Sequence, residues 1–122
     1  MSNRVVHFEI PCDNPEKEMN FFKEVFGWTF NKFGDESYWL AITGDEKSPG
    51  INGGIMKKKD PRQPVANSID VSNIDESITK VETAGGNIIV PKMAIPGVGW
   101  LAYFKDPDGN IHGMHQQDSS AK

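Results

Sequence analysis

The sequence is poor in the residues that build disulfides, metal–thiolate sites and membrane spans. Its 122 residues include one cysteine, Cys12, so neither an internal disulfide nor a CxxC metal pair can form. No apolar run approaches the ~20 residues that a membrane-spanning helix needs. Because the N-terminal residues also lack a signal-peptide pattern, we expect a cytoplasmic protein with no membrane partner.

The sequence also has fewer basic than acidic residues. The chain has 13 Lys and Arg against 17 Asp and Glu, a formal net charge of −4. The one basic cluster, at residues 57–59, has no interleaved aromatic side chains, so we expect no nucleic-acid partner. With 37% hydrophobic and 25% charged residues, the composition is that of one ordinary globular domain spanning 1–122.

The chain can be laid over itself at an offset of about 60 residues, which indicates an internal repeat. We expect a first module at about 4–60 and a second at about 65–116. A polar segment rich in proline, residues 60–64, joins the two modules. Residues 117–122 are predicted to form a flexible tail.

Each module opens with a strand pattern followed by a helix. Residues 5–10 alternate so that His7 and Glu9 share one strand face, and Asn67 lies 60 positions after His7 in the second strand. The helix of the first module is predicted to begin at Asn14–Pro15 and to end at Gly27.

Three strand-like runs follow each helix, at 28–33, 38–43 and 51–57 and again at 87–90, 100–104 and 111–115. The plan is therefore βαβββ written twice, an α+β fold class. A helix covers only one face of such a sheet, so the other face must curve around a partner sheet or a ligand. Because His7 and Glu9 lie on that second face, we expect a cavity that holds something polar.

Several motifs recur with this plan: His7 six residues before Asp13, the run 20–28 ending in Phe-Gly-Trp, the Gly85–Gly86 helix stop and the turn at 106–110. Together they resemble the vicinal oxygen chelate superfamily, which includes glyoxalases, bleomycin-resistance proteins, extradiol dioxygenases and epimerases, and within it a glyoxalase-related group. The resemblance implies two βαβββ modules whose curved mixed sheets pair into an open bowl. It also implies a homodimer with a small-molecule ligand.

Metal-dependent members of that superfamily carry one ligand on the first and one on the last strand of each module. In this sequence those places fall at His7, the Gly53–Gly54 region, Asn67 and Gly113, and only His7 is a usual ligand. We therefore expect no metal by the family pattern and no other cofactor. An unorthodox site for divalent Zn, Ni or Fe, built from His7, Glu9 and His115, is the open alternative.

Two functions follow from the resemblance and from these residues. The first is a binding protein for a small molecule of unknown identity, with Trp39, Asn67, Trp100 and His115 as ligand-binding residues. The second is a metal-dependent lyase, isomerase or dioxygenase that uses the unorthodox site. As an enzyme, the protein would use His7 as ligand or general base and Glu9 as proton acceptor, and these two are the candidate catalytic residues. His7 also fits a purely structural buried histidine. The segment 91–99 is a candidate lid over the site.

Overall fold

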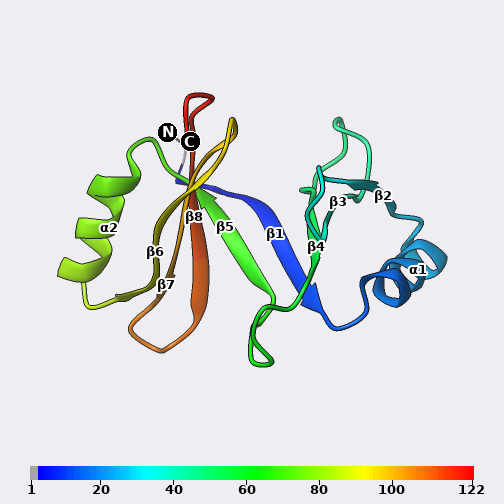
Figure 1. Ribbon diagram of the computed structural model, residues 1–122, viewed down its shortest axis with the longest axis horizontal. Helices are drawn as coiled ribbons and strands as arrows, with labels where there is room; N and C mark the ends of the chain where they lie inside the picture. Colours follow the sequence, from blue (N-terminus) through cyan, green and yellow to red (C-terminus); the bar gives the residue numbers. More distant parts are fainter. Residues whose placement is uncertain (1–2) are drawn as a thin grey trace. The chain divides into compact units, whose positions relative to one another are not determined.

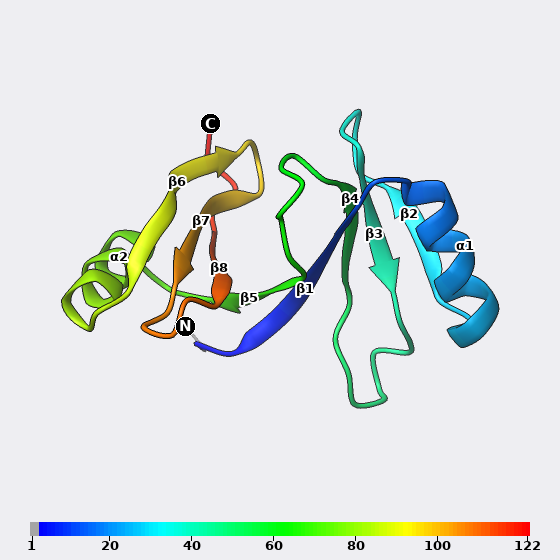
Figure 2. The ribbon, with the colours of Figure 1, turned by 90° about the horizontal axis from the view of Figure 1, so that it is seen from below.

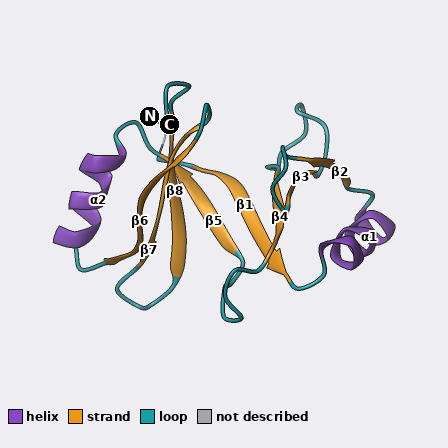
Figure 3. Cartoon of the chain, viewed as in Figure 1, coloured by secondary structure: helices purple, strands orange, loops and turns teal. Residues whose placement is uncertain are grey.

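A computed structural model describes residues 3–122 and shows an α+β protein with a mixed, unclosed strand arrangement (Figures 1 and 3). The predicted fold class and the doubled βαβββ plan are confirmed. Within the described residues, no helix has the length and apolar character needed to cross a membrane. The elements are β1 (Val5–Cys12), α1 (Pro15–Phe26), β2 (Thr29–Lys32), β3 (Tyr38–Ile42), β4 (Gly53–Lys57), β5 (Ala66–Asp70), α2 (Ile74–Thr83), β6 (Asn87–Ile95), β7 (Gly99–Lys105) and β8 (Ile111–Gln117).

The chain forms two compact units. Module one, as used below, is His7–Val65; module two is Ala66–Lys122 together with the residues up to Val6. The beginning of the chain groups with module two because the Asp70 backbone N–H donates to the Arg4 carbonyl (2.9 Å) and the Asn3 N–H donates to the Asp70 carbonyl (2.8 Å). The boundary therefore falls within β1, which the sequence had assigned wholly to the first module.

Module one is a sheet of order β2-β3-β4-β1, in which β1 runs parallel to β4 and the other pairs are antiparallel. Helix α1 begins as predicted, because the Asn14 side chain accepts from the Lys17 N–H (3.1 Å). Gly27 ends it in the left-handed conformation at φ 75°. Trp28 joins the helix to the sheet, since its ring lies 4.6 Å from Phe22 of α1 and 5.6 Å from Phe8 of β1. Figure 2 shows α1 on one side of the module-one strands.

Module two has the order β5-β8-β7-β6, with α2 packed against β6, β7 and β8. Its buried core consists of Val71, Ile74, Ala102 and Met114. Strand β6 continues to Ile95 along β7, so the segment 91–99 is mostly strand, and its prediction as a lid loop is wrong. Register shifts on either side of Val90 explain how Pro91 fits there, since a bulge leaves a backbone position outside the ladder.

The C-terminal residues make defined contacts in the structure, whereas the sequence led us to expect a flexible tail. The Asp118 N–H donates to the Val98 carbonyl and the Gly97 N–H donates to the Ala121 carbonyl, both at 2.9 Å. Ala121 is only 4% exposed. The last residues of the chain therefore hold the loop between β6 and β7 in place.

The predicted turn at residues 106–110 is organised by one carboxylate. Asp106 Oδ1 accepts from the backbone N–H groups of Asp108 (3.0 Å) and Asn110 (2.9 Å), and Asp106 Oδ2 lies 2.9 Å from His112 Nε2. The hydrogen bond with His112, followed by those from Asn110, lowers the pKa of Asp106 to about 2. The ionised carboxylate is thus the form that stabilises the turn.

Because the folded-state pKa of Asp106 is depressed, its contribution is complete above the unfolded pKa of ~3.9 and is lost as the pH falls toward 2. Asp106→Asn should therefore flatten the dependence of the urea midpoint on pH between pH 4 and 2. The matched control is Asp108→Asn, which removes a carboxyl two residues along the same turn and should leave the slope unchanged. An unchanged slope in Asp106→Asn would contradict this assignment.

Candidate functional site

Three polar side chains meet on one face of the module-one sheet. His7 Nε2 lies 2.7 Å from the Tyr38 hydroxyl, and that hydroxyl lies 3.5 Å from Glu9 Oε2. The imidazole and phenol rings are nearly parallel, with an interplanar angle of 6° and centroids 6.5 Å apart. Strands β1 and β3 therefore present one connected group, called below the His7–Tyr38–Glu9 cluster.

Tyr38 links the two predicted residues through a single proton. A phenol has one O–H, so it donates either to Glu9 or to His7, and in the first case the imidazole donates to the phenol oxygen. Burial raises the pKa of Tyr38, and the nearby Glu9 carboxylate raises it further by its charge and its hydrogen bond. The hydroxyl therefore stays protonated at neutral pH, and the cluster can pass a proton between carboxylate and imidazole.

A glycine of β4 makes room for this arrangement. A Cβ at Gly54 would overlap the Tyr38 hydroxyl, whereas one at its neighbour Gly53 would meet Phe8 on the opposite face of the sheet. Gly54 stands directly beside Glu9 in the register of β1 and β4. The resemblance implied a metal ligand at this position of β4. The chain has Gly54 there, and the Tyr38 hydroxyl fills the volume beside it.

The structure does not bring Trp39 to the cluster. Trp39 pairs with Ile55, whereas Leu40 pairs with Gly54, so Trp39 points to the opposite face from Gly54 and Tyr38. The Lys32 ammonium lies 5.4 Å from the centroid of the Trp39 ring. The aromatic residue that reaches the cluster is its neighbour Tyr38, which the sequence analysis did not single out.

The structure places Asn67 on the helix-covered face of β5. It shares a strand face with Ile69, which packs against the module-two core. On β1 the helix-covered face carries Phe8, whose ring contacts Trp28, whereas His7 lies on the other face with Tyr38. Aligning His7 with Asn67 at an offset of 60 thus joins opposite faces, since a shift of one residue turns a strand side chain over, and the ligand-binding role of Asn67 stays a prediction.

His115 and Asp70 pair directly across β8 and β5 and lie in a surface pocket of about 390 Å³. Burial lowers the pKa of His115, while the charge of Asp70 opposes that shift. The imidazole packs close to the backbone of β7, where a Cβ at Gly99 would lie 2.7 Å from its Nε2. The residues that line this Asp70–His115 pocket are Val6, Asp70, Gly97, Val98, His115, Gln117 and Ser119.

Trp100 lies on the helix-covered face of module two, away from His115. It pairs with Gln116, whereas His115 pairs with Leu101, and its ring packs against the core. The indole N–H donates to Asp118 Oδ2 (3.0 Å), and the Lys92 ammonium lies 4.6 Å from the ring centroid. These contacts indicate a structural residue that anchors the C-terminal segment.

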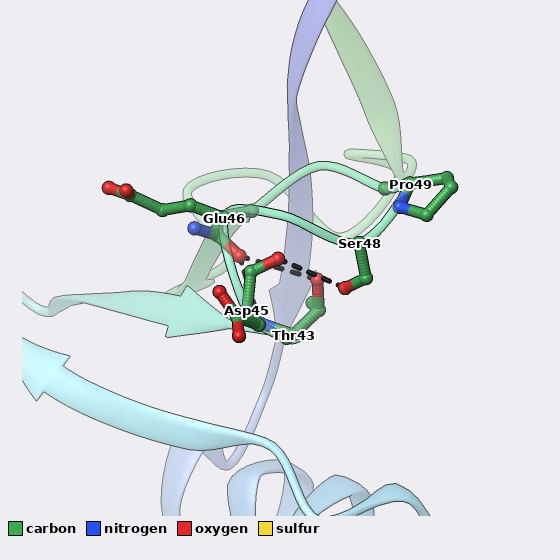
Figure 4. Close-up of a pocket in the computed structure, with 8 residues that line it drawn as sticks. Thr43, Asp45, Glu46, Ser48 and Pro49 are labelled. Carbon is green, nitrogen blue, oxygen red and sulfur yellow. Dashed lines mark hydrogen bonds between the residues drawn. The ribbon is translucent and has the colours of Figure 1, made fainter.

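A second hollow, of about 100 Å³, lies in the loop between β3 and β4 (Figure 4). Its polar groups bond to one another: the Thr43 hydroxyl donates to the Ile51 carbonyl (2.6 Å) and the Ser48 hydroxyl donates to the Asp45 carbonyl (3.0 Å). The Glu46 side chain extends away from these groups in Figure 4. The hollow is thus the interior of a well-bonded loop.

The residues at the family's ligand places do not fit its four-ligand metal site. Gly54 and Gly113 offer no donor, and a Cβ at Gly113 would already lie 3.2 Å from the Tyr103 ring. Among residues 3–122, no three His, Cys, Asp or Glu side chains gather as a metal-holding group. His7 and Glu9 lie together in module one, and His115 lies beside Asp70 in module two.

The doubled βαβββ plan is that of one family. Residues 4–112 match the Glyoxalase/Bleomycin resistance protein/Dioxygenase superfamily, and the chain belongs to it. Among curated relatives, the metallothiol transferase FosB of Shouchella clausii is 29% identical over 119 residues, covering 94% of this chain and 81% of the relative. A putative glyoxylase, CFP32 of Mycobacterium tuberculosis, is 29% identical over 108 residues, which is 84% of this chain and 40% of that protein.

Solved structures show the same fold at low sequence identity. A superfamily member from Vibrio splendidus 12B01 has a TM-score of 0.65 at 20% identity, covering 94% of this chain and 98% of the other. Methylmalonyl-CoA epimerase of Streptomyces coelicolor also has a TM-score of 0.65, at 10% identity, covering 100% and 99%. The match of residues 4–112 to the family model confirms the resemblance of the sequence to the superfamily, and these structures show its fold.

Proposed function

We propose that this chain binds a small oxygenated molecule on the module-one sheet face, with the His7–Tyr38–Glu9 cluster as its polar anchor and without the family's four-ligand metal. One observation carries the proposal: the Tyr38 hydroxyl lies 2.7 Å from His7 and 3.5 Å from Glu9, next to Gly54. A hydrogen-bonding group of the protein thus stands beside the place where metal-dependent relatives carry a ligand side chain.

The chemistry of the cluster suits a ligand with adjacent hydroxyl and carbonyl oxygens. The Tyr38 hydroxyl can donate to a carbonyl or ether oxygen of the ligand in place of Glu9, and the Glu9 carboxylate can then accept from a ligand hydroxyl. Because Tyr38 remains protonated, it acts as a neutral donor next to the carboxylate. If the bound molecule reacts, Glu9 and His7 are the groups placed to accept and return a proton through Tyr38.

The alternative is a metal-dependent lyase, isomerase or dioxygenase that uses His7, Glu9 and His115. Similarity to a relative named metallothiol transferase favours it. Two imidazoles and a carboxylate are a ligand set that suits Zn²⁺, Ni²⁺ or Fe²⁺. The two proposals differ in whether His7 and His115 serve one ion.

Metal content separates the two proposals. We expect protein purified without an affinity tag to contain no stoichiometric metal by elemental analysis. We also expect Zn²⁺, Ni²⁺ and Fe²⁺ to leave its melting temperature unchanged within about 1 °C, since a ligand stabilises only in proportion to its occupancy of the folded state. Stoichiometric metal that disappears in both His7→Ala and His115→Ala would overturn the metal-free proposal.

Ligand binding tests the cluster directly. In an NMR titration with hydroxyacetone, lactate and catechol, at least one probe should perturb the amides around His7 and Glu9. Tyr38→Phe should weaken that binding by roughly 3- to 10-fold, the value of one hydrogen bond of about 0.5–1.5 kcal/mol. Trp39→Phe, on the opposite face, is the matched control and should have no effect. Equal weakening by both variants, or by neither, would contradict the assignment.

Assembly and cellular location remain predictions of the same proposal. Family members of this kind are expected to work as homodimers in the cytoplasm. Size-exclusion chromatography with light scattering measures the assembly directly, and a dimer is the expected result.

A further inference from the structure

The Asp70–His115 pocket of module two uses none of the residues of the His7–Tyr38–Glu9 cluster. We propose that this pocket is a separate site for a small primary ammonium ion that carries a short aliphatic chain. The proposal does not rest on the function proposed above, because the polar residues it uses come from β5 and β8, and β1 contributes only Val6 to the pocket wall.

The charge of the pocket favours a cation. The residues lining it include one carboxylate, Asp70, and neither lysine nor arginine. His115 adds no positive charge at neutral pH, since burial lowers its pKa. A carboxylate has about four acceptor sites on its two oxygens, so Asp70 can receive an ammonium N–H in addition to the bonds it already makes. Ammonium–carboxylate bonds are among the stronger hydrogen bonds in proteins.

Neutral acceptors complete the polar end of the site. An ammonium group has three N–H donors, and Asp70 can receive one or two of them. Two other lining residues have side chains that can accept a hydrogen bond: neutral His115 through its unprotonated ring nitrogen and Gln117 through its amide oxygen. A carboxylate ligand would be disfavoured, because its negative charge would be repelled by that of Asp70.

The remaining walls of the pocket are aliphatic. Val6 and Val98 line the pocket and are 46% and 37% exposed, so part of their apolar surface is in contact with water. A short alkyl chain placed between them would remove apolar surface from water at about 25 cal/mol per Å². A volume of about 390 Å³ is in the range of small-molecule sites.

The rim of the pocket is held in place before any ligand arrives. The C-terminal segment fixes the β6–β7 loop because the Asp118 N–H donates to the Val98 carbonyl and the Gly97 N–H donates to the Ala121 carbonyl, each at 2.9 Å. Glycine at position 99 lets the imidazole of His115 approach the strand backbone. A rigid site loses less conformational entropy when it binds, so weakly held small ligands can still be selected.

The test compares three probes of one chain length: n-butylammonium, 1-butanol and butyrate, titrated at pH 7 into the full chain by ¹H–¹⁵N NMR. Butylammonium should shift the amides of Gly97, Val98 and Gln117 and should bind at least about 5-fold tighter than butanol or butyrate. Asp70→Asn, which keeps the side-chain shape, should abolish that preference. Asp108→Asn makes the same charge change on an exposed turn and should preserve it.

Equal binding of the three probes, or a preference that survives in Asp70→Asn, would overturn the proposal. His115→Gln is a second variant that removes the imidazole while keeping a polar side chain, and it should weaken butylammonium binding by about 3-fold or more. The amide spectrum of each variant reports whether it is folded. Tyr38→Phe should leave butylammonium binding unchanged, so that failure here and failure of the proposed function are distinguishable.

Discussion

Gly54→Ala is expected to destabilise the protein by about 2–3 kcal/mol and to break the hydrogen bond between His7 and Tyr38. The added Cβ would overlap the Tyr38 hydroxyl and ring carbon, so the phenol must leave its position. Overpacking of a filled site typically costs about 1–3 kcal/mol, and here a hydrogen bond is lost as well. Denaturation by guanidinium chloride measures the free energy of unfolding, and the chemical shifts of the His7 ring report the bond.

A double-mutant cycle shows whether the phenol is the cause. When Tyr38→Ala has removed the ring, the further change Gly54→Ala should cost less than about 1 kcal/mol. Gly44→Ala is the matched glycine control, because its Cβ would make only an ordinary contact of 3.5 Å with Ser48 Oγ. A cost for Gly54→Ala that is the same with and without the tyrosine ring would show that the overlap with Tyr38 is unimportant.

Ile55→Ala should cost about 3 kcal/mol of unfolding free energy, the second large effect. Ile55 is fully buried at 0% exposure, on the opposite face of β4 from Gly54. Removing a buried isoleucine side chain down to alanine costs about 2–5 kcal/mol, because the lost burial adds to the cavity that remains. Ile55→Val, which removes one methylene group, should cost only about 1 kcal/mol.

The exposed control for this core position is Ile51→Ala, since Ile51 is 37% exposed. We expect that variant to change the unfolding free energy by less than about 1 kcal/mol. Equal losses for Ile51→Ala and Ile55→Ala would contradict the burial described for β4. The midpoint and slope of urea denaturation, measured together, check that each variant unfolds in the same transition as the unmodified chain.

The doubled fold was predictable because its signals are local and repeated. Alternating strand residues, the Asn14 cap and the Gly27 stop each specify backbone conformation within a few residues. The β6 strand was cut short because Pro91 is a usual end signal, and a bulge that admits proline depends on pairing with β7, which is not local.

The sequence predicted two members of the cluster, His7 and Glu9, and missed the third, for a related reason. Alternation on one strand placed His7 and Glu9 together, but Tyr38 comes from another strand and its side of the sheet depends on register. One signal was present, because a glycine inside a strand leaves room for the close approach of a neighbouring group, and Gly54 marks the place that the Tyr38 ring fills. For Asn67 the repeat offset was needed to within one residue, which the shorter second helix made ambiguous.

The contacts of the last residues bear on how the protein is handled. The Ala121 carbonyl and the Asp118 N–H form hydrogen bonds with the loop at Gly97–Val98. The C-terminal residues therefore stabilise one wall of the Asp70–His115 pocket. Any peptide fused after Lys122 begins two residues beyond the buried Ala121. A polyhistidine extension there would bring its own imidazoles to the vicinity of His115, so a tag-free C-terminus is a condition for interpreting both metal content and amine binding.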